Sequence, residues 1–400
     1  MVLRHWGRHA EARDQLTAAV EVLQADPDTD TVRAIAELAG VAVFAGSSDA
    51  GELSAEALTL SQALGVDVGQ FVLPFLLRGI YLKATGKRRE AVAYYREATR
   101  LAEETGDNMA LGRALLNLAD ALAVTDPAAA AEAARTAAGH LRPAGHWDYL
   151  TFAITNLAQA LLMLGEWDTA EEELTQAADS SGQAGRDQIA CYRAWLAALR
   201  GDIATSETII AGLRDLRASE DPQEKSLVSM VEAFAAAAGG QPEDALRHAR
   251  ETLAHGTALG ISFESMRWAW PLAARAAFDV GDTATTRELL ALLDSSPPGH
   301  LAPMQKAERN LVRARLAASE GDQATRASFA AAISRLREHS TPYHLAHGLL
   351  DDAQYLTQLG DIDAAEAAIA EARGIAERLR CQPLLDRAAD LTPARPPVQA

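Results

Sequence analysis

The sequence predicts an all-α solenoid built from about ten helical hairpins stacked in a row. The first observation is a glycine that recurs every 36 to 41 residues, with Asp126 in place of one copy. A period of this length is typical of one supersecondary unit copied many times, and not of a single compact core. The second observation is that no stretch alternates apolar and polar residues for long enough to predict a sheet. The recurring glycines are Gly7, Gly46, Gly86, Gly165, Gly201, Gly240, Gly281, Gly321 and Gly360.

Each recurring glycine predicts the turn between the two helices of a hairpin. Glycine readily adopts the left-handed conformation that closes helix C-termini. An acidic residue often follows it, as at Glu166, Asp202 and Asp282, where it can accept hydrogen bonds from the first amides of the next helix. Five residues after the glycine a small side chain usually allows close helix packing, and Thr286 and Arg326 depart from this rule.

The chain begins inside the first predicted unit. Gly7 lies so close to the N-terminus that the first helix of its hairpin is missing, and Val2, Leu3 and Trp6 are expected to form its last turn. Terminal repeats of a solenoid normally carry a polar cap. We therefore expect the chain to be the C-terminal part of a longer polypeptide, or to have a start that was assigned too late. Nine complete hairpins follow.

The clearest unit runs from about Trp147 to Gly185. Its first helix has an apolar stripe at spacings of three and four, which predicts an amphipathic helix. Its second helix is expected to turn Ala170, Leu174 and Ala177 inward. A hairpin of this length cannot bury its stripe alone, so each unit requires its neighbours. The stripe consists of Leu150, Ile154, Leu157, Leu161 and Leu164.

The boundaries between later units carry helix-breaking residues, such as Asp221–Pro222 and Thr341–Pro342. The last second helix is expected at 363–379, and a short segment at 383–391 is expected to form a capping helix. One repeat domain is therefore predicted for residues 1–391. Residues 392–400 are rich in proline and predict a flexible tail.

Composition indicates which kinds of partner and which cellular compartment to expect. The net charge of −18 disfavours nucleic acid and anionic membranes, and it favours a basic segment of a protein partner. The longest basic run, Lys87–Arg89, is interpreted as a solvated turn. The two cysteines, the absence of an apolar signal segment and the absence of an apolar run of membrane-spanning length predict a cytoplasmic protein.

No pattern predicts a catalytic, metal or cofactor site. The segment 79–88 has the wrong glycine spacing for a phosphate-binding loop and reads as helical. The pairs His5/His9 and His344/His347 lack further ligands at suitable spacing, so structural or surface roles are favoured. Cys191 is expected to be a small buried residue. Adjacent Asp351 and Asp352 point to different faces of a helix. We therefore expect a protein that is not an enzyme.

The segments 101–123 and 157–177 resemble tetratricopeptide repeats, and the segment 364–391 looks like the end of a long-repeat array of this kind. The period near 40 residues is closer to the long-repeat arrays of bacterial signalling ATPases. Those include regulators related to the maltose activator of the LuxR class, and actinobacterial fusions of an adenylate cyclase, an ATPase and a C-terminal array. The resemblance implies a right-handed superhelix whose first helices line a concave groove. Neither cyclase, ATPase nor DNA-binding segments lie in this chain, so those activities are not carried over.

Aligned first helices share one face at the positions nine and six residues before the turn. The resemblance places this face in the groove, and we predict that a peptide or protein binds there. Amides can hold a partner backbone and aromatic rings can anchor its side chains. The alternative is that these residues only support helix–helix contacts. The predicted partner-binding residues are Asn117, Asp120, Asn156, Gln159, Tyr192 and Trp195; the same positions in the last three repeats hold Leu272, Arg275, Val312, Arg315, Asp351 and Gln354.

The aromatic segment 266–271 opens another first helix. It could anchor a partner, but the tendency of tryptophan to be buried favours packing between hairpins. The leading hypothesis is thus a non-catalytic interaction or regulatory module in cytoplasmic signalling. The rival is a C-terminal sensor or autoinhibitory part of a multidomain signalling ATPase, transcription regulator or adenylate cyclase. An enzyme on this scaffold would require a polar pocket with perturbed pKa values, which the sequence does not indicate.

Overall fold

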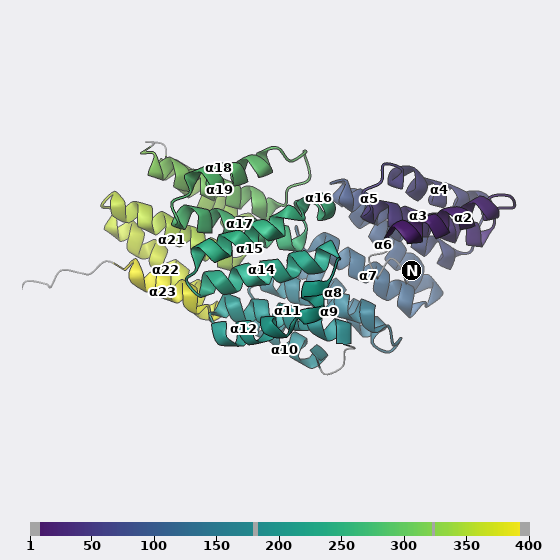
Figure 1. The fold of residues 1–400 in the computed structure, drawn as a ribbon, viewed down its shortest axis with the longest axis horizontal. Helices are drawn as coiled ribbons and strands as arrows, with labels where there is room; N and C mark the ends of the chain where they lie inside the picture. Colours follow the sequence, from purple (N-terminus) through teal and green to yellow (C-terminus); the bar gives the residue numbers. More distant parts are fainter. Residues whose placement is uncertain (1–8, 179–182, 322–324, 393–400) are drawn as a thin grey trace, which may run out of the picture.

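The protein is an all-α array of helical hairpins (Figure 1). The computed structural model describes residues 9–178, 183–321 and 325–392, which contain α-helices, one short 3₁₀ helix and no strand. Nine hairpins follow one another in these residues, as the glycine period predicts. They are α3 (Thr29–Phe44) with α4 (Ala50–Leu64), α5 (Val72–Ala84) with α6 (Arg88–Thr105), α7 (Asn108–Leu122) with α8 (Pro127–Leu141), α9 (Trp147–Leu164) with α10 (Trp167–Ala178), α11 (Gln183–Arg200) with α12 (Ile203–Gly212), α14 (Pro222–Ala238) with α15 (Pro242–Ala254), α17 (Glu264–Asp279) with α18 (Thr283–Asp294), α19 (Pro303–Ser319) with α20 (Thr325–His339), and α21 (Pro342–Gln358) with α22 (Ile362–Leu379).

Shorter elements precede, interrupt and follow the hairpins. The helix α2 (His9–Leu23) is the second helix of the truncated first unit, and α23 (Gln382–Asp390) is the capping helix expected near the C-terminus. The remaining elements are η1 (Val68–Phe71), α13 (Arg214–Ala218) and α16 (Gly256–Leu259). The residues expected to form a last turn before Gly7, and those of the proline-rich tail after 392, lie outside the described residues.

The predicted glycine turns have the conformation that glycine alone adopts without strain. Gly165 has a φ of +81° after α9, and the amide of Glu166 donates to the carbonyl of Leu161 over 2.9 Å. Gly201 has a φ of +85°, and Asp202 donates to Ala197 over 2.9 Å in the same way. This bond pattern is the Schellman motif, which pairs the last carbonyls of a helix. The period of glycines therefore reflects a repeated helix-ending motif.

Aspartates after these turns cap the second helices. A carboxylate oxygen of Asp202 accepts a hydrogen bond from the amide of Thr205 over 3.1 Å, and Asp282 accepts one from Thr285 over 2.9 Å. Asp126, which replaces the glycine in one unit, has a φ of −147° and caps α8 through the amide of Ala129. That turn therefore ends α7 without a left-handed residue.

The small residues five positions after the glycine lie in the hairpin interface. Ala91, Ala170 and Ala245 are fully buried. Arg326, the clear departure, is exposed because Thr325 takes the buried position in that repeat. Arg326 forms an ion pair with Asp361 instead. A side chain therefore enters the interface only where it is small enough for the two helices to approach.

The array curves until distant repeats touch. A Cβ atom added to Gly165 would lie 3.0 Å from Pro342 at the start of α21, and one on Gly201 would lie 2.8 Å from Pro383 in α23. The thiol of Cys381 donates a hydrogen bond to the carbonyl of Leu199 over 3.0 Å. The helix α23 accordingly lies beside α11 (Figure 1). The inner face of the first helices is thus closed by the chain itself over part of its length.

Candidate functional site

Polar side chains from six helices meet on the inner face of the array. They form the inner polar cluster, which comprises Lys83 on α5, Arg88 on α6, Asp120 on α7, Gln159 on α9, Tyr192 on α11, and Glu264 and Arg267 on α17. Successive first helices contribute most of these residues because corresponding positions of each repeat face inward. The cluster therefore depends on the curvature that brings α17 back towards α6 and α11.

Contacts between distant repeats hold the inner polar cluster together. Lys83 and Asp120 form an ion pair, and the Tyr192 hydroxyl donates to Oε2 of Glu264. Arg88 donates to the hydroxyl of Ser262 over 3.0 Å, although the two residues are 174 positions apart. Arg267 donates through Nη1 to the carbonyl of Ser262, also over 3.0 Å. The segment before α17 is thus fixed against the α5–α6 hairpin.

Four buried hydrogen-bonding atoms of this cluster have no partner within the described chain. They are Nε of Arg88, Oε1 of Glu264, and Nε and Nη2 of Arg267. A buried donor or acceptor without a partner destabilises the folded state by about 1–3 kcal/mol. Buried polar atoms are nearly always paired, so water or a bound group is the expected partner of these atoms.

Burial and the charges of the cluster shift the pKa values of its two acids in opposite directions. Burial raises the pKa of Glu264 to about 7, despite the Tyr192 hydrogen bond and the nearby charge of Arg267. Burial also acts to raise the pKa of Asp120, but the charges of Lys83, Arg267 and Arg88 outweigh it and lower that pKa. Near neutral pH, Asp120 is therefore ionised while Glu264 is divided between its two protonation states.

Three of the predicted binding residues lie on the accessible edge of the inner face. Asn117 and Asn156 are half-buried, and each donates its side-chain amide to a backbone carbonyl, of Arg113 and Leu116 respectively. The side chain of Asp120 is 35% exposed. These three residues can reach a partner without any rearrangement of the array.

The other three predicted residues are buried. Gln159, Tyr192 and Trp195 are at most 3% exposed. In this structure the two aromatic residues contact the chain itself. Their part in binding stays a prediction.

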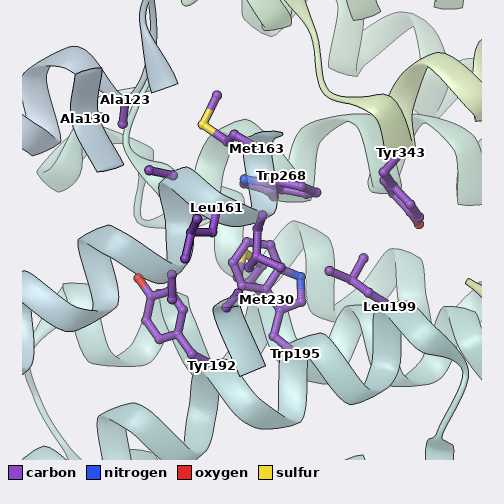
Figure 2. Close-up of a cluster of buried hydrophobic side chains, with 14 of the residues drawn as sticks. Ala123, Ala130, Leu161, Met163, Tyr192, Trp195, Leu199, Met230, Trp268 and Tyr343 are labelled. Carbon is purple, nitrogen blue, oxygen red and sulfur yellow. The ribbon is translucent and has the colours of Figure 1, made fainter. Parts of the chain in front are cut away.

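An aromatic cluster fills the inner face next to the inner polar cluster, from α11 to α21 (Figure 2). Trp195 and Trp268 meet edge to face with centroids 4.8 Å apart, and Trp268 lies 4.7 Å from the ring of His344. Trp268 and Trp270 are fully buried, so the packing interpretation of the aromatic segment is confirmed. Such pairs add about 0.5–1.5 kcal/mol each beyond their burial. The cluster consists of Trp195, Phe234, Trp268, Tyr343, His344 and His347.

A second charged cluster follows in the last repeats. Asp351 on α21, whose side chain is 1% exposed, forms an ion pair with Arg387 on α23 and lies 3.7 Å from Nε of Arg315 on α19. Burial raises the pKa of the neighbouring Glu308 to about 8, against the charges of Arg275 and Arg315. We call these five residues the C-terminal charge cluster; they connect α17, α19, α21 and α23.

Buried nucleophiles and histidines show no sign of activation. Burial raises the pKa of the Cys191 thiol, and burial lowers the pKa values of His344 and His347 well below the usual value. A thiol reacts as the thiolate, so a raised pKa makes Cys191 inert near neutral pH. The structural roles expected for these residues agree with their burial.

Four members of the inner polar cluster were not among the predicted binding residues. Arg88 was assigned to a solvated turn, but its side chain is partly buried and reaches Ser262. Lys83, Glu264 and Arg267 lie at other positions of their helices than the two that were aligned. A charged residue inside a mostly apolar first helix, as at Lys83, was the one signal available in the sequence.

The comparisons with known proteins support the fold. No protein-family model and no curated protein matches the sequence. The separase–securin complex of Saccharomyces cerevisiae is similar with a TM-score of 0.50 and 10% identity, covering 98% of this chain and 33% of that one. The human IFIT1 dimer with m7Gppp-AAAA has a TM-score of 0.49 at 12% identity, covering 98% and 86%. A Rap protein complexed with Competence and Sporulation Factor has 0.48 at 11% identity, covering 94% and 99%.

At these identities the likeness concerns the fold alone. The order of hairpins and the likeness to separase show a tetratricopeptide-like α-solenoid. The resemblance to arrays of bacterial signalling ATPases stays a prediction. None of the described helices combines the length and the apolar character that crossing a membrane requires.

Proposed function

We propose that this protein is a non-catalytic binding module that takes a peptide or protein segment at the inner polar cluster. The observation that carries the proposal is the set of four buried, unpartnered hydrogen-bonding atoms on Arg88, Glu264 and Arg267. Donors and acceptors are both present, as recognition of a peptide backbone and a charged side chain requires. The accessible amides of Asn117 and Asn156 border the same face.

The charge of the cluster refines the expected partner. Three cations face two acids, and Glu264, with a pKa of about 7, is only partly ionised near neutral pH. The unpartnered atoms of Arg88 and Arg267 are donors, and guanidinium groups bind carboxylates with well-defined geometry. An acidic group of the partner is therefore expected at this site, although the net charge of the whole chain favours a basic segment.

The regulatory part of the proposal rests on the sequence. The repeats resemble arrays found in bacterial signalling proteins, and the composition is typical of a cytoplasmic chain. A binding module of this kind would act by holding a segment of another protein, or of the same polypeptide, on its inner face.

Selection from a random peptide library tests the proposal. The immobilised protein is expected to enrich peptides rich in Asp and Glu, and the Arg88→Gln variant is expected to lose that enrichment. Arg96→Gln is the matched control because Arg96 lies on the same helix and is exposed. Failure to enrich any sequence, or equal enrichment by wild type and Arg88→Gln, would contradict the proposal.

A further inference from the structure

Three metal-ligating side chains converge on the hairpin of α14 and α15. Glu232 lies on α14, and His248 and Glu251 lie three residues apart on one face of α15. Nδ1 of His248 is 3.3 Å from Oε2 of Glu232 and 3.1 Å from Oε2 of Glu251. One ligand atom from each residue can be chosen so that all three lie within 4.8 Å of one another.

An open cavity of about 340 Å³ adjoins these side chains. Its lining comes from α12, α13, α14 and α15, and it includes Glu232 and His248. The side chains of Glu232 and His248 are 17% and 19% exposed, so they are held by packing yet remain reachable from the cavity. A small ion can therefore enter without any change in the fold.

The spacing of the ligand atoms fits a small divalent ion. Bonds of about 2.0–2.2 Å to nitrogen and oxygen in a tetrahedral shell place neighbouring ligand atoms about 3.3–3.6 Å apart. The two distances from His248 Nδ1 are 3.1 and 3.3 Å, within a few tenths of an ångström of this spacing, and the two carboxylate oxygens lie within 4.8 Å of each other. An imidazole nitrogen with two carboxylates favours a transition-metal ion over Mg²⁺ or Ca²⁺, which prefer oxygen ligands alone.

Two arginines border the site, but neither pairs with the Oε2 atoms of Glu232 and Glu251 that face His248. Arg217 donates through Nε to the other oxygen of Glu232 over 3.0 Å, which fixes the orientation of that carboxylate. Arg247 contacts His248 at Nε2 over 3.0 Å and at Nδ1 over 3.5 Å. It also pairs with Asp244 over 2.7 Å and with Oε1 of Glu251 over 3.3 Å. When a metal takes Nδ1, the ring proton moves to Nε2, and the half-exposed Arg247 keeps Asp244 as its partner.

We propose that Glu232, His248 and Glu251 bind a divalent transition-metal ion, for which Zn²⁺ is the probe. Three protein ligands leave a fourth position open, in contrast to closed structural zinc sites. That position is reachable through the cavity, so a side chain or small molecule bound there can complete the coordination. The ion also connects α14 to α15 and stabilises this hairpin, because it binds the folded arrangement and not the separated ligands.

Competition with a chromophoric chelator measures the affinity for Zn²⁺. Wild type is expected to bind one Zn²⁺ per chain more tightly than Mg²⁺, with a rise in the thermal unfolding midpoint. His248→Ala and Glu251→Gln are expected to weaken binding by at least about tenfold. Even the loss of a residue that only hydrogen-bonds to a metal ligand costs about 10–100-fold in metal affinity. Glu251 is half-exposed, so the second variant tests the site without risk to folding.

The matched controls are His255→Ala, at the end of the same helix, and Glu243→Gln, on its exposed face. Both controls are expected to bind Zn²⁺ as wild type does. The proposal is overturned if wild type shows no preference for Zn²⁺ over Mg²⁺. It is equally overturned if the affinity and the rise in unfolding temperature persist in His248→Ala and Glu251→Gln.

Discussion

Replacing Glu308 by glutamine should make the protein more resistant to alkaline conditions. Glu308 lies on α19 in the C-terminal charge cluster and is 1% exposed. Burial raises its pKa to about 8; Asp351 reinforces this shift, while Arg275 and Arg315 oppose it. Glutamine imitates the protonated form at every pH, so the variant isolates the effect of ionising this one carboxyl.

The sign of the effect follows from proton linkage. The folded state holds the Glu308 proton up to about pH 8, whereas the unfolded chain releases it near 4.5. The stabilisation is therefore complete below pH 4.5 and is lost as the pH rises through 8. At about 1.4 kcal/mol per pH unit, the interval between these two pKa values corresponds to a loss of up to about 5 kcal/mol in the free energy of unfolding of wild type. Glu308→Gln lacks this loss.

Urea unfolding at pH 5, 7 and 9 measures the difference. Tryptophan fluorescence is a suitable probe because Trp268 and Trp270 lie on α17, which packs against α19. We expect the variant to gain several kcal/mol on wild type between pH 5 and pH 9. Glu320→Gln, at a half-exposed surface position, is the control and should differ from wild type by less than about 0.5 kcal/mol. A difference that does not change with pH would refute the reasoning.

Three further substitutions test the packing. Gly165→Ala should lower the free energy of unfolding by at least about 1 kcal/mol more than Gly281→Ala does. Both glycines have a positive φ, but only Gly165 faces Pro342. Equal losses in urea unfolding would argue against the contact between distant repeats. Trp268→Ala should lower the free energy of unfolding by about 3–5 kcal/mol, whereas Leu292→Ala at an exposed position should lower it by under about 1 kcal/mol. Calorimetry measures both losses. Similar small losses would contradict the packing of the aromatic cluster. Arg387→Ala should lower the free energy of unfolding by about 3–5 kcal/mol, because it leaves the buried carboxylate of Asp351 without this partner. Arg337→Ala, in a surface pair with Glu371, should lower it by under about 1 kcal/mol. A smaller loss for Arg387→Ala would show that other groups compensate the charge of Asp351.

The hairpins could be predicted because their signals are local. Gly165 ends a helix by its own backbone conformation, and Asp202 caps the next helix through an amide three residues away. The small residues at the interface, such as Ala170, repeat with the same period. Asp126 was counted as a substitute for glycine, and its actual role as an N-cap was visible in the Asp–Pro pair that opens α8.

The site could be predicted only in part because it depends on how small rotations between repeats add up. Aligning the first helices identified Asp120, Gln159 and Tyr192 as facing one side, and these residues do meet in one cluster. The alignment carries no information about curvature, so it missed that Arg88 reaches Ser262, 174 residues away. For the same reason it did not indicate that Trp195, on the predicted binding face, packs against Trp268.

The ratio of two dissociation constants tests the proposed binding role most directly. An acidic peptide selected on wild type would be titrated against Arg88→Gln and Arg96→Gln by calorimetry. A hydrogen bond to a charged group contributes about 1.5–3 kcal/mol, so Arg88→Gln should weaken binding by about tenfold or more. Arg96→Gln should stay within about twofold of wild type. Equal affinities for the two variants would contradict binding at the inner polar cluster.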